Sequence, residues 1–272
     1  MRIIIYGLGI IGGSLAVAFN RAGHEVFAKN RSRDAIEYAL ERDMIDGEVN
    51  SYEGADLVIL ALPPKVAMRE LDEGRFPAGC IVSDVCGVKR ALEETVCSKP
   101  RAYRYVGIHP MAGKETSGIT SASVDLFDGA NLVVTSSEQT DRDALSSVKE
   151  LAKEIGFGRI VECSAERHDE MIALTSQLAH IASSSYVKSP LSEDCEGFTG
   201  GSFQDMTRVA GVDENMWTEL FLLNRDKILK ETERLVDRLA EYRDALRDGD
   251  EERIRSLMRE GRLFREQYFP RK

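Results

Sequence analysis

Short runs of β-branched and apolar residues alternate with helical patterns over the first part of the chain. The runs that predict strands are residues 3–6, 25–28, 57–61, 80–83, 105–108, 131–135 and 159–161. Strands that alternate with helices along a chain are typical of a parallel sheet with helices packed on its faces. We therefore expect an α/β domain built on a parallel sheet.

The β-branched runs stop after Cys163, and only helical patterns follow. The predicted helices are residues 164–187, 204–210, 215–247 and 250–267. In the third, apolar residues recur at helical spacing and charged residues occupy the remaining face. The sequence thus predicts two domains, an α/β domain over residues 1–163 and an all-helical domain over residues 164–272.

A glycine motif follows the first predicted strand and opens a helix. The first glycine permits a tight turn, the second lets a pyrophosphate approach the backbone, and the third lets helix and strand pack closely. A turn kept only for packing is the alternative, but the strand–loop–helix setting favours a Rossmann-like dinucleotide-binding domain. The residues expected to hold the cofactor there are Gly7, Leu8, Gly9, Ile10, Ile11 and Gly12.

The end of the second predicted strand bears on the choice of cofactor. An acidic residue there would bind the ribose 2′-hydroxyl of NAD and repel a 2′-phosphate, but this chain has Asn30, Arg31 and Ser32. Arginine and serine can bind a phosphate, so NADP is favoured and NAD stays possible. In the alternative, Arg31 and Arg33 are solvated charges at a helix start, and Asn30 binds the ribose of either cofactor.

Composition narrows the possible partners. The formal net charge of −10 over 272 residues disfavours nucleic acid, which usually needs a basic face. The cysteines are odd in number and form no CxxC pair, so neither a disulfide framework nor a metal site is expected. These cysteines are Cys80, Cys86, Cys97, Cys163 and Cys195.

The chain shows no targeting pattern. It opens directly into an apolar strand, and no apolar run approaches the roughly 20 residues that span a bilayer. We expect a cytoplasmic protein with no membrane partner and an anionic substrate bound by a locally placed Arg or Lys.

One histidine is a candidate catalytic residue. His109 opens a glycine-punctuated loop, residues 109–118, downstream of the nucleotide-binding start. A neutral imidazole that accepts a hydroxyl proton lowers the barrier to hydride loss from a secondary alcohol. A structural hydrogen-bond donor is the alternative role for His109.

A polar stripe lies beside an apolar stripe on the first predicted helix of the helical domain. Ser176, His180 and Ser183 or Ser184 recur at three- to four-residue spacing beside an apolar stripe. Such a stripe suggests that the helix faces a pocket. Alternatively, His180 is a buried histidine satisfied by neighbouring hydroxyl groups.

Three segments are more specific than the glycine motif alone. They are GLGIIGGSLA at residues 7–16, HPMAGKETSG at residues 109–118 and GGSFQDMTRVA at residues 200–210. Together they resemble the prephenate and arogenate dehydrogenases of tyrosine biosynthesis, and the similarity extends to Trp217 and Asn224. The resemblance implies hydride transfer from C4 of the substrate ring to a nicotinamide, with loss of the ring carboxylate and aromatisation.

The resemblance also implies roles for particular residues. His109 matches the catalytic histidine, and Arg208 matches the arginine that holds a substrate carboxylate. His180, Ser176 and Glu115 are the other expected substrate-binding residues. The helical domain is expected to bind substrate and to pair with a second subunit in a homodimer, with the active site in the cleft between domains.

The chain departs from the family pattern at two positions. Family members commonly have proline where Ala179 stands, and this proline bears on the reach of His180. Many also carry a serine where this chain has Gly87, and its hydroxyl contacts the catalytic histidine and the substrate. Either a water or Cys86 replaces that contact, or the contact is absent.

The alternatives concern the substrate and the class of protein. Prephenate, which gives 4-hydroxyphenylpyruvate, and arogenate, which gives tyrosine, both fit, as does another NADP-dependent dehydrogenase of hydroxy acids or imines. A nucleotide-sensing regulator is the non-enzymatic alternative, but no basic DNA-binding segment is visible. We expect a monofunctional catalytic core without a mutase or regulatory domain.

Overall fold

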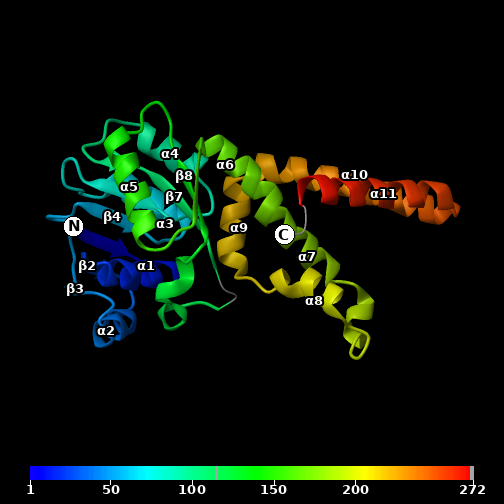
Figure 1. The fold of residues 1–272 in the computed structure, drawn as a ribbon, viewed down its shortest axis with the longest axis horizontal. Coiled ribbons are helices and arrows are strands. Elements are labelled where there is room, and N and C mark those ends of the chain that lie inside the picture. Colours follow the sequence, from blue (N-terminus) through cyan, green and yellow to red (C-terminus); the bar gives the residue numbers. More distant parts are fainter. Residues whose placement is uncertain (114–115, 270–272) are drawn as a thin grey trace. The chain divides into compact units, whose positions relative to one another are not determined.

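The computed structural model describes residues 1–113 and 116–269 (Figure 1). The chain forms two compact units, one from Met1 to Asn224 and the other from Arg225 onward. The site described below belongs to the first unit. The predicted fold class, a Rossmann-like parallel sheet followed by an all-helical region, is confirmed.

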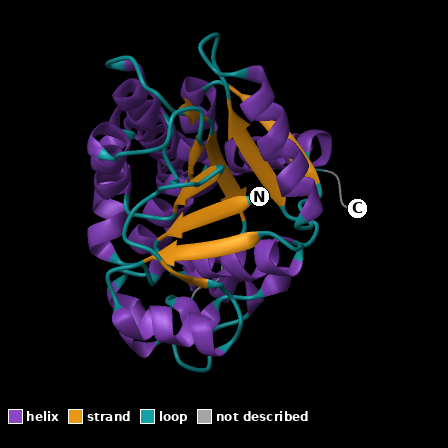
Figure 2. Cartoon of the chain, turned by 90° about the vertical axis from the view of Figure 1, so that its left-hand side faces the viewer, coloured by secondary structure: helices purple, strands orange, loops and turns teal. Residues whose placement is uncertain are grey.

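The first unit contains a six-stranded parallel sheet with the order β3-β2-β1-β4-β5-β6 (Figure 2). Its strands are β1 (Arg2–Tyr6), β2 (Glu25–Lys29), β3 (Gly47–Glu48), β4 (Leu57–Leu60), β5 (Ile81–Asp84) and β6 (Arg104–Tyr105). The helices between them are α1 (Ile10–Arg21), α2 (Arg33–Glu41), α3 (Pro64–Glu73) and α4 (Arg90–Cys97). The strand order changes direction between β1 and β4, and ligands of such sheets bind beyond the carboxyl ends of the strands at this point.

Helices cover both faces of the sheet, because alternate strand residues point to opposite sides. Ile3 and Ile5 of β1 join a buried cluster with Phe19 of α1. Ile4 joins a second cluster with Leu71 of α3. All three isoleucines are fully buried, which explains the uninterrupted apolar run in this strand.

A second sheet of three strands carries the histidine motif. Its strands are β7 (Gly107–Met111), β8 (Asn131–Thr135) and β9 (Arg159–Cys163), and α5 (Arg142–Glu154) connects the last two. Strand β8 runs antiparallel to β7 and parallel to β9. The chain between β7 and β8 turns back through 3-10 turns at Ile119–Ser121 and Val124–Phe127, so this part departs from the single parallel sheet that the sequence predicts.

The region after β9 is helical throughout its described part. Its α-helices are α6 (Ala165–Ile172), α7 (Leu178–Tyr186), α8 (Gly201–Thr207), α9 (Glu214–Leu223), α10 (Arg225–Asp248) and α11 (Glu251–Tyr268). A π-helical turn at Ala173–Gln177 joins α6 to α7, and 3-10 turns lie at Pro190–Asp194 and Arg208–Ala210. No helix in the described ranges is long and apolar enough to cross a bilayer.

Two predicted helices are each divided in the structure. The helix predicted over residues 164–187 contains the π turn, and the one predicted over residues 215–247 ends at Leu223 and restarts at Arg225. The second break occurs at Asn224, whose backbone leaves helical geometry and whose side chain is fully buried. The buried amide donates hydrogen bonds to the carbonyl of Asp169, at 2.9 Å, and to Gln177, at 2.7 Å. These tertiary bonds hold the residue at which the helix stops.

Candidate active site

The glycine motif forms a cradle at the carboxyl end of β1. A Cβ at Gly7, where φ is +101°, would overlap the carbonyl oxygen of Ala61, and a Cβ at Gly12 would overlap the carbonyl oxygen of Gly7. A Cβ at Gly9 would meet no heavy atom within 4 Å. The outer glycines therefore allow close packing of strand and helix, while Gly9 leaves open space beside the backbone. This is the arrangement that a pyrophosphate needs.

The start of α1 is available to an anion. Gly9 is its N-cap, and among the described residues no side chain caps the helix. The first N–H groups of the helix lack intrahelical partners, and the helix dipole favours negative charge there. Leu8 differs, because its N–H donates to Oδ1 of Asn30 at 2.9 Å. Leu8 and Asn30 thus brace the glycine loop from within.

The residues after β2 have distinct environments. Ser32 caps α2, its hydroxyl accepting from the N–H of Ala35 at 3.4 Å. The Arg33 guanidinium forms ion pairs with Glu37 at 3.1 Å and Glu48 at 2.8 Å. Arg31 is exposed. Of the two arginines, Arg31 is therefore the better placed for a ligand.

A cavity of about 750 Å³ brings together four of the predicted residues, His109, Ser176, His180 and Arg208. Other parts of its wall come from the loop after β7, the π turn and the beginning of α9, including Trp217. Glu115, predicted to bind substrate, lies outside the described residues. The cavity is large enough for a small organic ligand.

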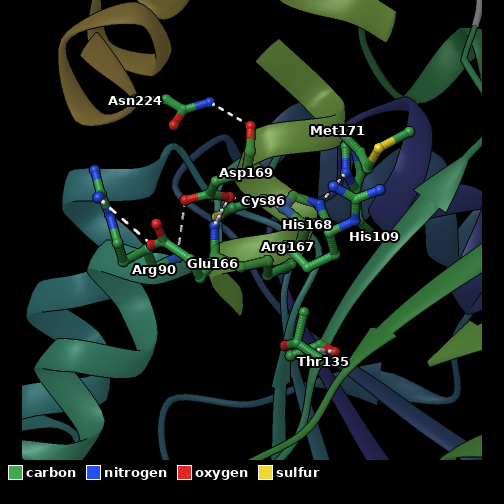
Figure 3. Close-up of polar contacts among 12 residues, drawn as sticks. Cys86, Arg90, His109, Thr135, Glu166, Arg167, His168, Asp169, Met171 and Asn224 are labelled. Atoms are coloured by element: carbon green, nitrogen blue, oxygen red, sulfur yellow. Dashed lines mark hydrogen bonds and ion pairs between the residues drawn. The ribbon is translucent and has the colours of Figure 1, made fainter. Parts of the chain in front are cut away.

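His109 is the third residue of β7 and contacts a second histidine (Figure 3). Its Nδ1 lies 2.8 Å from Nε2 of His168, and Nδ1 of His168 lies 2.7 Å from a carboxylate oxygen of Asp169. A carboxylate only accepts, so His168 donates from Nδ1, and neutral His168 then accepts at Nε2. His109 must in turn donate from Nδ1. We assign from this network an unprotonated Nε2 on His109, the nitrogen that can accept a substrate proton.

Electrostatics keep the His109 ring neutral. Burial, then the neighbouring His168 and the positive charge of Lys89, hold the pKa of His109 well below its usual range. Burial also lowers the pKa of His168, against the opposing effect of Asp169. A neutral imidazole at physiological pH is the protonation state that a general base requires.

The Asp169 carboxylate is held by backbone groups as well as by His168. One oxygen accepts from the N–H of Lys89 at 2.8 Å, and the other from the N–H of Arg90 at 3.0 Å. The helix that carries Asp169 begins after Ser164, whose hydroxyl accepts from the N–H of Arg167 at 3.1 Å. The position of the carboxylate is therefore fixed by the start of α4 and the cap of α6.

A buried ion pair joins the two ends of the loop between β5 and α4. Nζ of Lys89 lies 2.5 Å from a carboxylate oxygen of Asp84, and the hydroxyl of Tyr105 donates to the other oxygen at 2.6 Å. Lys89 and Asp84 are both fully buried. Because an isolated buried charge is costly, these partners depend on each other.

Gly87, the position at which the resemblance implies a serine, lies beside His109. A Cβ at Gly87 would lie 3.7 Å from Cε1 and 3.8 Å from Nε2 of His109. The thiol of Cys86 donates instead to the carbonyl of Leu62 at 3.4 Å, and burial raises its pKa well above the usual range. Cys86 therefore remains a thiol with its proton directed at a backbone oxygen. Among the described residues, no hydrogen bond engages Nε2 of His109, and His109 lines the cavity.

His180 presents one ring nitrogen to the cavity. Its Nδ1 donates to the carbonyl of Val209 at 2.7 Å, and its ring lies 3.7 Å from the ring of Trp217, measured between centroids. Burial, together with the nearby charge of Arg208, lowers the pKa of His180. A π turn at Ala173–Gln177 directly precedes the helix that carries His180, and π turns are frequent at functional sites.

Sequence reasoning missed His168 and Asp169, and it did not give Trp217 a role. A weak signal existed for His168 alone, because His168, Ser176 and His180 are separated by eight and four residues on what was predicted to be one helix. His168 lies two turns before Ser176, and the apolar Ile172 interrupts the polar stripe between them. The contact with His109 depends on tertiary packing and has no local signature.

The carboxyl ends of neighbouring strands connect the glycine cradle to His109. The cradle follows β1, Ala61 follows β4 and Gly87 follows β5, and these three strands are adjacent. Since neighbouring strands are spaced about 4.8 Å apart, the cradle and Gly87 are separated by roughly 10 Å across the sheet edge. A dinucleotide bound at the cradle can extend over this distance.

Comparisons with known proteins identify the family. The chain matches the family model for the prephenate dehydrogenase nucleotide-binding domain over residues 15–162. It matches the model for the prephenate dehydrogenase dimerization domain over residues 164–260. Prephenate dehydrogenase of Bacillus subtilis is 30% identical over 279 residues, which cover 97% of this chain and 75% of that protein.

Solved structures agree with the sequence relatives. Synechocystis arogenate dehydrogenase aligns with a TM-score of 0.84 and 25% identity, covering 98% of this chain and 100% of the other. Prephenate dehydrogenase from A. aeolicus, in complex with hydroxyphenyl propionate and NAD+, aligns with a TM-score of 0.84 and 26% identity, covering 98% of each chain. The chain described here belongs to the prephenate dehydrogenase family.

Proposed function

We propose that this protein catalyses the NAD(P)-dependent oxidative decarboxylation of prephenate to 4-hydroxyphenylpyruvate. The observation that carries the proposal is the cavity that collects His109, His180 and Arg208. Family membership and the A. aeolicus complex with NAD+ and an aromatic acid support it.

His109 acts as the general base in this proposal. Its Nε2 takes the proton of the C4 hydroxyl while the C4 hydrogen leaves as hydride. The bound nicotinamide supplies the hydride acceptor. General-base catalysis of this kind contributes roughly 10²–10⁴-fold to rate.

The second chemical step needs little help from the protein. Once C4 is a ketone, the bond from the ring to its carboxylate breaks, CO₂ leaves, and the released electron pair makes the ring aromatic. The oxygen at C4 then takes up a proton, which the imidazolium of His109 can return. The protein's contribution is to hold the ring in place.

Substrate carboxylate is held by Arg208, with His180 and Ser176 as further polar contacts. A guanidinium binds a carboxylate through two parallel hydrogen bonds and so fixes orientation as well as position. His180 has its Nδ1 engaged by Val209, which leaves Nε2 for the ligand. Glu115 is retained as a proposed substrate-side residue.

The glycine cradle holds the cofactor pyrophosphate, and NADP is the preferred cofactor in this proposal. Gly7, Gly9 and Gly12 fit a dinucleotide for the steric reasons given above. The exposed Arg31 is available to a 2′-phosphate, and no acidic residue stands in the run from Lys29 to Arg33. Asn30 orients the loop through Leu8 and reaches the carbonyl of Ser32 at 3.0 Å.

A functional division at residues 163/164 and a homodimer complete the proposal. The two matched family models meet at this boundary, and the second is described as a dimerization domain. Several apolar side chains of α10 and α11 are half exposed or more, and a second copy of the chain would bury them. They are Leu229, Val236, Leu239, Leu246, Met258, Leu263 and Phe264.

Arogenate is the second candidate substrate, favoured by the likeness to Synechocystis arogenate dehydrogenase. It differs from prephenate in carrying an amine where prephenate has a side-chain ketone. The test follows nicotinamide absorbance with purified protein for prephenate and arogenate, each with NAD and with NADP. We expect the fastest turnover with prephenate and NADP. No turnover with any of the four pairs would reject the proposed function.

A further inference from the structure

His109, His168 and Asp169 form a hydrogen-bonded row on the side of His109 away from Gly87 (Figure 3). His168 is 2% exposed and Asp169 is fully buried. Neither residue lines the cavity that holds His109. They therefore reach the reacting atoms only through His109.

The row has a defined hydrogen-bond direction. Both Asp169 oxygens already accept from backbone N–H groups, of Lys89 and Arg90, which prevents the carboxylate from turning. Nδ1–H of His168 therefore donates to the carboxylate, and Nδ1–H of His109 donates to Nε2 of His168. Reversing this direction would place two donors or two acceptors against each other, which is costly for a buried group.

Among the described residues, no side-chain hydrogen bond holds the opposite side of the ring. Gly87 has no side chain, and the Cys86 thiol donates to Leu62. The orientation of His109 must therefore come from Nδ1. From these contacts we propose that His168 and Asp169 are positioning residues that hold His109 in the Nδ1–H tautomer, with Nε2 as the proton acceptor.

This inference rests on the proposed function, because it assigns a purpose to the tautomer of the general base. The charged and titratable groups around the row come from three places in the fold. His168 and Asp169 lie on α6, Asp84 ends β5, and Lys89 precedes α4. The Lys89 ammonium forms its ion pair with Asp84, which is not a member of the row.

Two variants of His168 separate positioning from packing. In His168→Gln, the amide oxygen can reach the place of Nε2 and accept from His109. In His168→Asn, the shorter amide reaches only the place of Nδ1, so it can keep the bond to Asp169 while His109 loses its acceptor. Each variant removes the imidazole ring and leaves an amide side chain, which makes the pair a matched comparison.

We expect His168→Asn to lower kcat by about a hundredfold or more, and His168→Gln to stay within about tenfold of the unsubstituted protein. The KM for the cofactor should change little in either variant. Equal losses of kcat in the two variants, at equal thermal stability, would contradict the proposal. A lower kcat in His168→Gln than in His168→Asn would also contradict it.

A second measurement needs no substrate. The chain has four histidines, so the ring ¹⁵N signals can be assigned by substituting them one at a time. We expect the Nδ1–H tautomer of His109 at neutral pH in the unsubstituted protein and in His168→Gln, and a mixture of tautomers in His168→Asn. An Nε2–H tautomer in the unsubstituted protein would overturn the inference, whereas a failed turnover assay with the expected tautomer would overturn only the proposed function.

Discussion

Proton acceptance at His109 depends on a pKa set by its surroundings. Burial and the nearby charge of Lys89 disfavour the imidazolium, and His168 occupies the other nitrogen. The ring is therefore ready to accept a proton without first losing one. Substitutions that alter the burial of His109 or the charge beside it should change the pH dependence of the reaction.

The first prediction concerns that pH dependence. Because the His109 pKa is lowered, the base form persists as the pH falls through the usual histidine range of about 6.5, and kcat/KM should fall only below it. Stability should respond differently. The unfolded chain takes up protons on these histidines near pH 6.5 while the folded protein does not, so the free energy of unfolding should decrease as the pH drops below about 6.5. A kcat/KM profile with its acid limb at or above the usual histidine range would contradict the account.

The second prediction concerns substrate anchoring. Hydrogen bonds to charged groups contribute about 1.5–3 kcal/mol, so Arg208→Ala should raise the KM for prephenate roughly tenfold to a hundredfold, with a smaller effect on kcat. Steady-state kinetics measure this directly. Arg75→Ala, at an exposed arginine outside the cavity, is the control. An unchanged KM in Arg208→Ala would place the anchor elsewhere.

The third prediction concerns cofactor choice. Arg31→Asp should lower kcat/KM for NADP by about tenfold or more while leaving that for NAD nearly unchanged, because a carboxylate repels the 2′-phosphate. Arg33→Ala should have the smaller effect, since Arg33 is held in ion pairs with Glu37 and Glu48. Parallel losses with both cofactors in Arg31→Asp would argue against phosphate recognition.

Motif and fold account for different parts of the site. His109, Arg208 and His180 were accessible to sequence reasoning because each stands in a recognisable segment, and all three line one cavity. The roles of His168 and Asp169 were not, because the contact of His168 with His109 arises only from tertiary packing. Gly87 could be identified as a departure from the family pattern, but only the structure shows that its missing side chain would adjoin Nε2 of His109.

Among elements, the sequence predicted most strands and helices, but not the breaks within long helices or the partners of short strands. Strand β8 has the predicted bounds, whereas the two-residue β3 lacks any β-branched residue that could have signalled it. The run predicted at residues 105–108 falls across β6 and β7, which belong to different sheets. Hydrophobic periodicity reports the local conformation but not which neighbour a strand pairs with.

The fourth prediction concerns the break after α9. Asn224→Ala removes two buried hydrogen bonds, to Asp169 and Gln177, and should lower the free energy of unfolding by about 1–3 kcal/mol. Chemical denaturation measures the change. Asn215→Ala, at an exposed position in α9, should stay within about 0.5 kcal/mol. Equal effects of the two substitutions would show that the buried contacts are dispensable.

For the whole molecule, the exposed apolar residues of α10 and α11 give the fifth prediction. Light scattering during size-exclusion chromatography should report twice the 30.3 kDa of one chain. Leu239→Glu places a charge among these residues and should shift the mass toward that of one chain, whereas Gln139→Glu, in an exposed loop of the first unit, should not. A single-chain mass for the unsubstituted protein at micromolar concentration would contradict the proposed homodimer.

The central claim is that His109 accepts the C4 hydroxyl proton during hydride removal, and that loss of the ring carboxylate follows from this oxidation. It is tested most directly with prephenate labelled in the ring carboxylate, by comparing labelled CO₂ released with reduced nicotinamide formed. The account predicts equal amounts of the two products, and a loss of both in His109→Asn by about 10²–10⁴-fold with cofactor affinity retained. Reduced nicotinamide without CO₂, or near-normal turnover in His109→Asn, would contradict it.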